Sequence, residues 1–222
     1  MGQQILPFYL VCDESGSMAG EPLDAINKAL PELHQEIGLN PVVADKTQFA
    51  IIGFSDSAEV LLPLSDLSQV TQLPLLETKV STNFAAAFRC VKEQIELDVA
   101  RLKAAGNMVY RPVVFFLTDG HSTSSFRDEW EALTESAFAY RPNIVSFGLG
   151  KGVDEDTITS IANFRAFLDD GTMSPAQALR EFAVALTKSI VRSGSTTSPS
   201  GGMTLQTPDE VPGFKNLPLD AL

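Results

Sequence analysis

The fold of this chain is decided by ILPFYLVC at residues 5–12 and by DESGS, which follows directly at residues 13–17. A continuous apolar run of this length is typical of a parallel strand that is covered on both faces. The strand stops at a loop of oxygen donors, in which Asp13, Ser15 and Ser17 alternate, so a loop turning around one point can direct all three side chains the same way. We therefore predict a buried strand whose carboxyl end carries a polar cluster.

Strands and helices are predicted to alternate along the rest of the sequence. Apolar residues at helical spacing predict helices, and short apolar runs predict strands. The predicted helices lie at residues 23–37, 84–105, 128–139, 154–162 and 174–190, and the predicted strands lie at 47–54, 58–62, 113–117, 144–149 and 165–168. Pro31 conflicts with the first helix, because an interior proline costs about 3 kcal/mol, and we expect a kink or a break near residues 27–30.

This alternation is typical of an α/β protein with buried parallel strands. The turn-like Ser55-Asp56-Ser57 favours an antiparallel hairpin between residues 47–54 and 58–62. We predict an open, doubly wound, mostly parallel sheet with one antiparallel edge strand and helices on both faces. In such sheets ligands bind outside the carboxyl ends of the strands. Asp13 and Asp119 each follow a buried strand directly, so both are expected at that edge.

Composition limits the partners of the chain. It has 222 residues, 44% of them hydrophobic, which is enough for a full core in one domain. A formal net charge of −12 and a pI near 4.5 argue against nucleic acid and against an anionic membrane surface. The sequence contains no apolar run of membrane-spanning length and no basic segment leading into an apolar one at its start. We expect a soluble cytoplasmic protein.

The sequence near the C-terminus changes character. Residues 193–202 read SGSTTSPSGG, which is the composition of a flexible linker. The tail at 203–222 carries prolines and a glycine among apolar residues, and two alternatives stay open for it. It is either disordered or an extended peptide that docks on its own domain or on a partner. We predict a folded domain over residues 1–192, followed by a linker and tail over 193–222.

The polar cluster has the chemistry of a metal site. One carboxylate and two hydroxyls form a hard, oxygen-only ligand set, which suits Mg²⁺ or Mn²⁺ better than zinc or copper. Each feature also has an ordinary explanation when taken alone. A serine-rich loop forms turns with local hydrogen bonds, Asp119-Gly120 is a common turn pair, and Thr82 can serve as a helix N-cap. Their joint occurrence at strand ends favours the metal site.

Three elements now stand in order: Asp13-x-Ser15-x-Ser17, then Ser81-Thr82-Asn83 opening a helix, then Thr118-Asp119-Gly120 after a strand. In this order they resemble a von Willebrand factor A domain with its metal-ion-dependent adhesion site. The resemblance covers about residues 5–192. Within the family, the chain looks most like the bacterial tellurite-resistance group of TerY-like proteins. The segments that carry this narrower match are residues 17–22, 110–113 and 115–120.

The resemblance implies a ligand set, residue by residue. Asp13, Ser15 and Ser17 would supply the first metal-binding loop, Thr82 would donate a hydroxyl from the second, and Asp119 would bind directly or through a water. The implied cofactor is Mg²⁺, with Mn²⁺ or Ca²⁺ as alternatives. Glycines usually precede that threonine in the family, whereas Val80 and Ser81 stand here, so the resemblance leaves the path of the second loop open.

The expected function is binding. Two carboxylates and three hydroxyls would leave a coordination position of an octahedral metal open to a carboxylate or phosphate of a partner protein. The resemblance implies a role in a bacterial stress or tellurite-resistance system. We expect that the protein is not an enzyme, because the sequence shows no nucleophile, histidine and carboxylate in the order of a catalytic triad that would include His121. The alternative is a Mg²⁺-dependent phosphotransfer domain, receiver-like or phosphatase-like, although Ser15 stands where such a phosphatase needs a second Asp. A scaffold without a working metal site is the third possibility.

Overall fold

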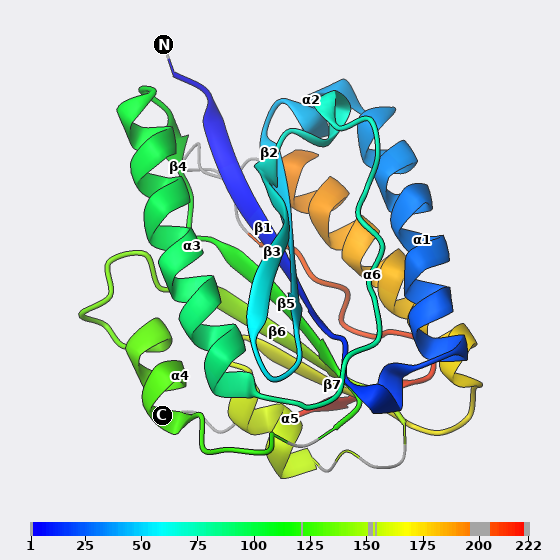
Figure 1. The fold of residues 1–222 in the computed structure, drawn as a ribbon. Coiled ribbons are helices and arrows are strands. Elements are labelled where there is room, and N and C mark those ends of the chain that lie inside the picture. The colour runs from blue at the N-terminus through cyan, green and yellow to red at the C-terminus, as the bar shows by residue number, and fades with distance from the viewer. Residues whose placement is uncertain (1, 121, 151–152, 154, 196–204, 220–222) are drawn as a thin grey trace.

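The computed structural model describes residues 2–120, 122–150, 153, 155–195 and 205–219, and Figure 1 shows the fold. The strands are β1 (Gln4–Asp13), β2 (Thr47–Phe54), β3 (Ala58–Ser65), β4 (Met108–Val109), β5 (Val113–Thr118), β6 (Asn143–Gly148), β7 (Arg165–Asp169) and β8 (Phe214–Leu217). The helices are α1 (Glu21–Gly38), α2 (Pro41–Ala44), α3 (Phe84–Ala104), α4 (Arg127–Thr134), α5 (Glu155–Ile161) and α6 (Pro175–Ser195), with short 3-10 turns η1 (Gly16–Met18) and η2 (Leu67–Gln69).

One sheet runs through the molecule in the order β3-β2-β1-β5-β6-β7-β8, and the short β4 pairs with the start of β1. The pairs β2–β1, β1–β5, β5–β6 and β6–β7 are parallel, whereas β3 runs antiparallel to β2 at one edge. The predicted α/β class and the predicted antiparallel edge are therefore confirmed. The opposite edge holds a second antiparallel strand, β8, which the prediction did not include.

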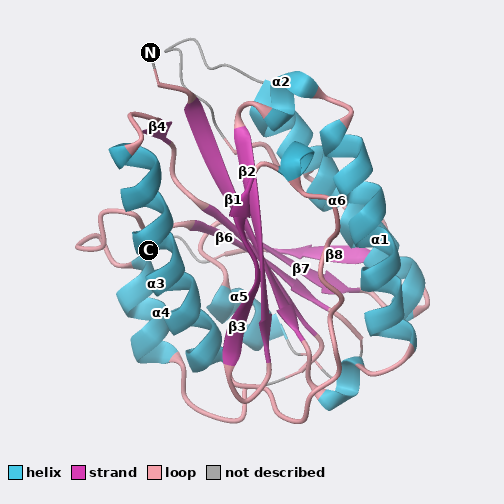
Figure 2. Ribbon diagram, turned by 45° about the horizontal axis from the view of Figure 1, so that its top comes forward, coloured by secondary structure: helices cyan, strands magenta, loops and turns pink. Residues whose placement is uncertain are grey.

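The helices form a layer on each side of the sheet (Figure 2). α1, α2 and α6 cover one face, where residues of β1 such as Phe8 and Leu10 are buried against them. α3, α4 and α5 cover the other face, which buries Tyr9 and Val11 of the same strand. Successive residues of β1 thus enter opposite cores, which is why the strand is apolar without interruption. None of the helices in the described part of the chain is long and apolar enough to span a membrane.

Of the expected kink or break in the first helix, the break is wrong, because α1 is one helix of 18 residues that includes Pro31. Pro31 itself is exposed, and the apolar side of the helix is buried against the sheet and α6. That side contributes Leu23, Ile26, Leu30, Leu33 and Ile37. Burying one such side chain is worth about 1.5–3 kcal/mol, so the packing of the whole side outweighs the roughly 3 kcal/mol penalty of one interior proline.

The C-terminal segment docks on the domain. α6 begins at the predicted Ser174-Pro175, where Gln177 and Ser174 exchange two hydrogen bonds, and it extends to Ser195. The predicted linker residues 196–202 lie outside the described residues. Of the two alternatives for the tail, the extended peptide is what residues 205–219 form. β8 pairs with β7, and Phe214 packs edge-on against Phe147 with ring centroids 5.4 Å apart.

Candidate metal centre

The candidate centre lies where two neighbouring parallel strands end. β1 ends at Asp13 and β5 ends at Thr118, and Cys12 is in register with Leu117. Asp13 and Asp119 therefore lie at the carboxyl edge of the sheet, as predicted from their positions after buried strands. A hydrogen bond of 2.5 Å from the Thr118 hydroxyl to Asp13 Oδ2 joins the two strand ends directly.

The first loop turns back on its own carboxylate. The backbone N–H of Ser15 donates to Asp13 Oδ1 at 2.9 Å, and the hydroxyls of Ser15 and Ser17 lie 3.1 Å apart. Ser17 then donates a 2.7 Å hydrogen bond to Asp119 Oδ1. Met18, fully buried in the short turn η1, anchors the loop to the core. The structure thus joins four of the five predicted ligands in one chain of hydrogen bonds.

Thr82, the fifth predicted ligand, lies near the turn that follows β5. Its hydroxyl oxygen is 3.8 Å from the place where a Cβ at Gly120 would stand. Its carbonyl accepts hydrogen bonds from the N–H and hydroxyl of Thr123, at 2.7 and 2.8 Å, which ties the second loop to the loop after β5. The N-cap of α3 is Asn83, whose side chain accepts from the N–H of Ala86. Thr82 is therefore not the cap of that helix, and its hydroxyl lies near Gly120, the residue after Asp119.

The path of the second loop is held by contacts at its two ends. The N–H of Lys79 donates to the carbonyl of Glu14 at 2.6 Å, and the N–H of Asn83 donates to the carbonyl of Ser55 at 2.7 Å. Between these anchors Val80 projects into solvent and is 90% exposed. The departure from glycine at positions 80 and 81 is thus accommodated, because the side chain of Val80 points away from the neighbouring loops.

Glu14 has a structural role that sequence reasoning did not define. Its carboxylate is 1% exposed, accepts from the N–H of Glu77 at 2.9 Å and pairs with Lys79 Nζ at 2.8 Å. Lys79 also pairs with the more exposed Glu59. A Cβ at Gly53 would lie 2.2 Å from Glu14 Oε2, so a glycine is needed in β2 for this carboxylate to fit. Glu14 therefore points away from Asp13 and braces the second loop.

The electrostatics of the centre favour a cation. Asp13 is fully buried, and its burial raises the pKa of its carboxyl to about 6, with the charge of Asp119 adding to the increase and hydrogen bonds from Ser15 and Thr118 opposing it. Burial also raises the pKa of Asp119. Among the described residues neither carboxylate pairs with a lysine or arginine. Two close carboxylates without a cationic side chain form an incomplete site that a divalent cation would neutralise.

The donor set consists of oxygen atoms. Within the described ranges, no three His, Cys, Asp or Glu side chains gather closely enough to hold a metal. The cluster instead offers two carboxylates and three hydroxyls, all of them oxygen donors of the kind that Mg²⁺ accepts alongside water. His121, two residues after Asp119 in the sequence, lies outside the described residues.

Comparisons with known proteins agree with this architecture. A sequence model of the von Willebrand factor type A domain matches residues 8–180. The uncharacterised protein sll0103 of Synechocystis sp. (strain ATCC 27184 / PCC 6803 / Kazusa) is 24% identical over 177 residues, which are 80% of this chain and 40% of that protein.

Solved structures share the fold. Proximal thread matrix protein 1 from the mussel byssus, with a zinc-occupied MIDAS motif, superposes with a TM-score of 0.58 at 16% identity, over 86% of this chain and 48% of that one. A von Willebrand factor type A protein from Catenulispora acidiphila gives 0.58 at 13% identity, over 84% and 43%. At these identities the similarity concerns the fold alone. This chain spans between 40% and 48% of the length of the three proteins named.

Proposed function

Because the chain belongs to the von Willebrand factor type A family, we propose that its oxygen cluster is a metal-ion-dependent adhesion site and that the protein is a metal-dependent interaction module. One observation carries the proposal. The buried Asp13 lies beside Asp119 and three hydroxyls without a compensating lysine or arginine among the described residues. The residues that would hold the ion are Asp13, Ser15, Ser17, Thr82 and Asp119, and the ion we favour is Mg²⁺, with Mn²⁺ or Ca²⁺ as alternatives.

The residues of the cluster support binding of a partner through the metal. Only two carboxylates serve the site, so a bound Mg²⁺ would supply an electrophilic position for a carboxylate or phosphate oxygen of a partner protein. The Ser17–Asp119 hydrogen bond holds the first loop against the turn after β5, and Thr118 holds the Asp13 carboxylate in place. A cation would thereby allow a protein with a net charge of −12 to bind an acidic partner.

The biological setting is a separate part of the proposal. The resemblance of residues 17–22, 110–113 and 115–120 to TerY-like proteins supports a role in a bacterial stress or tellurite-resistance system. The acidic composition supports a protein that works without nucleic acid or an anionic membrane surface, and the location we propose is the cytoplasm.

The phosphotransfer alternative has less support. A receiver-like site needs a second acid next to Asp13 that faces the metal, and Glu14 is the residue in that position. Its carboxylate is committed to Lys79 and to the N–H of Glu77, away from the cluster. We therefore propose a non-enzymatic role. Incubation with acetyl phosphate and Mg²⁺ tests this point, since labelling that disappears in Asp119→Asn would establish phosphotransfer.

Thermal unfolding tests the metal site itself. A ligand present at about one hundred times its Kd adds roughly 2.7 kcal/mol of stability, which for a domain of this size raises Tm by about 5–10 °C. We expect Mg²⁺ to raise Tm relative to EDTA in the wild type and not in Asp119→Asn. Glu36→Gln, which removes an exposed charge on α1, is the matched control and should keep the full increase in Tm. Equal increases in wild type and Asp119→Asn would refute the assignment.

A further inference from the structure

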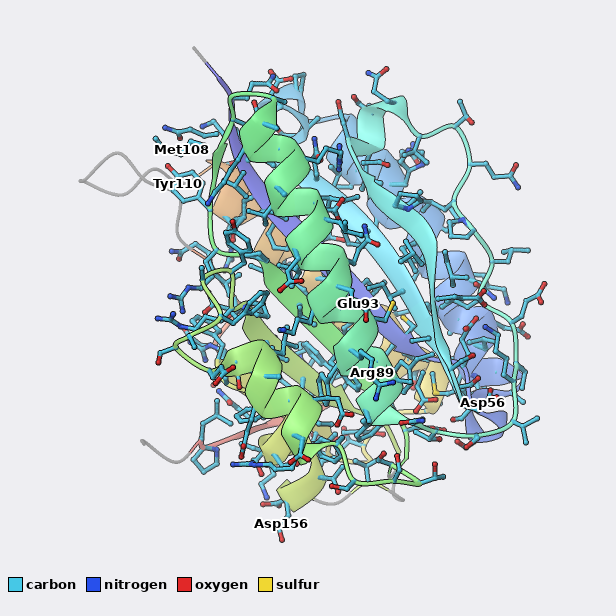
Figure 3. The ribbon with its side chains drawn as sticks, turned by 60° about the vertical axis from the view of Figure 1, so that its left-hand side comes forward. Asp56, Arg89, Glu93, Met108, Tyr110 and Asp156 are labelled. Atoms are coloured by element: carbon cyan, nitrogen blue, oxygen red, sulfur yellow. The ribbon has the colours of Figure 1, made fainter. Side chains whose placement is uncertain are left out.

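The tripeptide Tyr-Arg-Pro occurs twice, at residues 110–112 and 140–142. The first copy leads into β5 and the second into β6, which are neighbouring parallel strands with Val113 in register with Asn143. The N–H of Asn143 donates to the carbonyl of Pro112 at 2.9 Å, so the two copies enter the sheet next to each other. Figure 3 shows Tyr110 at this end of the molecule, near Met108 of β4. Sequence positions 30 residues apart thus supply the same side chains to one place.

A pocket of about 160 Å³ lies between these two segments and α3. Arg111, Arg141 and Lys103 contribute three cations to its wall, and Tyr110 and Tyr140 contribute two aromatic rings. No aspartate or glutamate belongs to the wall as the structure describes it. Lys103 Nζ lies 4.6 Å from the centroid of the Tyr140 ring, which holds the ammonium at the pocket.

The three cations are not committed to ion pairs. Within the described part of the chain none of them pairs with a carboxylate, whereas Lys79, Arg89 and Arg101 do. Arg141 donates one long hydrogen bond of 3.4 Å to the carbonyl of Ser136, which leaves most of its guanidinium donors available. In an acidic chain, three cations in one pocket without an acid represent a local charge excess that an anionic ligand would balance.

The two prolines restrict the backbone of the arginines that precede them. A residue that precedes proline is restricted to extended backbone conformations, and this restriction applies to both Arg111 and Arg141. Pro112 and Pro142 are themselves buried, so the backbone of each arginine is held at the point where the chain enters the core. Binding a ligand between them therefore loses less backbone freedom than binding to arginines on a free loop.

We propose that this pocket is a second binding site, which takes the phosphoryl group of a small phosphate ester. Paired guanidinium groups match phosphate oxygens with two hydrogen bonds each, and tyrosine rings offer a surface to the organic part. The volume is smaller than the roughly 300–1,000 Å³ of pockets that enclose a whole ligand, so the pocket holds the phosphoryl group and a short adjoining part. Repulsion from distant acids is screened beyond about 10 Å at 0.1 M salt.

The site is separate from the metal centre. The pocket precedes the first residue of β5, whereas Asp119 follows the last, and six residues at about 3.3 Å each separate the two ends by roughly 20 Å. Binding in the pocket should therefore proceed in EDTA, and its outcome is independent of the metal proposal.

The test is a titration of the full chain, labelled with ¹⁵N, in EDTA at constant ionic strength, followed by amide chemical shifts. The probes are inorganic phosphate, phenyl phosphate and acetate. We expect saturable shifts at the amides of residues 110–111 and 140–141, with phenyl phosphate binding more tightly than inorganic phosphate and acetate binding at least tenfold more weakly. Acetate binding as tightly as inorganic phosphate would overturn the assignment of a phosphoryl group as the ligand. Equal affinities for inorganic phosphate and phenyl phosphate would overturn the proposal that the ligand is a phosphate ester.

Variants locate the binding. Arg111→Gln should weaken phenyl phosphate at least tenfold, and Arg141→Gln should do the same if its thermal unfolding matches the wild type. Arg180→Gln, which removes an exposed arginine from α6 on the other face of the sheet, should leave the affinity unchanged. The Arg111 side chain is exposed and makes no ion pair with the described residues, so its substitution tests the site without loosening the fold. Equal weakening by Arg111→Gln and Arg180→Gln, or shifts that never saturate, would overturn the site.

Discussion

The Thr118 hydroxyl donates a 2.5 Å hydrogen bond to Asp13 Oδ2, and both residues are fully buried at the ends of neighbouring strands. A hydrogen bond to a charged group is worth about 1.5–3 kcal/mol. Thr118→Val keeps the shape of the side chain but removes the donor, so we expect the free energy of unfolding in EDTA to fall by about 2 kcal/mol. Urea unfolding measures this change. Thr118→Ser retains the hydroxyl and should lose less stability. A Thr118→Val variant as stable as the wild type would show that the hydrogen bond to Asp13 contributes nothing.

The pKa of Asp13 predicts an unusual pH dependence for the metal-free protein. Burial raises this pKa from 3.8 to about 6, so the folded state binds the proton more tightly than the unfolded state does. The contribution of this group to stability is therefore greatest below pH 3.8 and is lost as the pH rises through 6. A pKa raised to this extent corresponds to a penalty on the order of 3 kcal/mol at neutral pH.

Asp13→Asn isolates that contribution. In EDTA at pH 7.5 we expect the variant to be at least as stable as the wild type, because it removes a buried charge that lacks a cation. With saturating Mg²⁺ the order should reverse, since only the wild type gains from the ion. Thermal unfolding of both proteins in EDTA and in Mg²⁺ measures this reversal in the order of stability. A variant that is less stable than wild type in EDTA by several kcal/mol would contradict the idea of an uncompensated charge.

Thr82 and Asn83 are adjacent but should behave differently. Thr82→Ala removes a hydroxyl that faces the turn after Asp119, so we expect weaker Mg²⁺ binding by calorimetry and little change in stability. Asn83→Ala removes the N-cap of α3 and should lower stability by about 1 kcal/mol. Mg²⁺ affinity that survives Thr82→Ala unchanged would remove this residue from the ligand set.

The Glu14–Lys79 pair predicts an asymmetric pair of variants. Lys79→Met leaves Glu14 buried without its cation, and breaking a buried pair in this way costs about 3–5 kcal/mol; the partial exposure of Lys79 favours the lower end. Glu14→Gln keeps an acceptor for the N–H of Glu77 and leaves Lys79 with Glu59, so we expect a loss of about 1 kcal/mol. The double variant should recover part of the loss of Lys79→Met. Equal losses in the two single variants would contradict this account.

The edge of the sheet that carries the candidate metal centre was predictable, because each of its carboxylates follows a strand that can be recognised locally. Asp13 and Asp119 each follow an apolar run, and the carboxyl ends of parallel strands share one edge of the sheet, although the pairing of β1 with β5 does not follow from the sequence. The brace between Glu14 and Lys79 was not predictable, because its partners are 65 residues apart and meet only through the irregular path of residues 66–82. The meeting of the two Tyr-Arg-Pro segments likewise depends on the order of β5 and β6 in the sheet, which periodicity does not give. α1 continues as a helix through Pro31 because packing outweighs local propensity.

β8 escaped prediction because it is short and its two central residues, Lys215 and Asn216, are exposed, so only Phe214 and Leu217 carry an apolar signal. This strand makes the C-terminal segment part of the folded unit.

Phe214→Ala should lower the free energy of unfolding by about 3 kcal/mol, because removal of a buried aromatic ring that packs on Phe147 leaves a cavity. Lys215→Ala removes only an exposed ion pair with Glu155, is the matched control and should change stability by less than about 1 kcal/mol. Truncation after Ser195 should destabilise at least as much as Phe214→Ala. If the truncated chain unfolds at the same Tm as the full chain, the segment is an independent tail and its pairing with β7 contributes no stability.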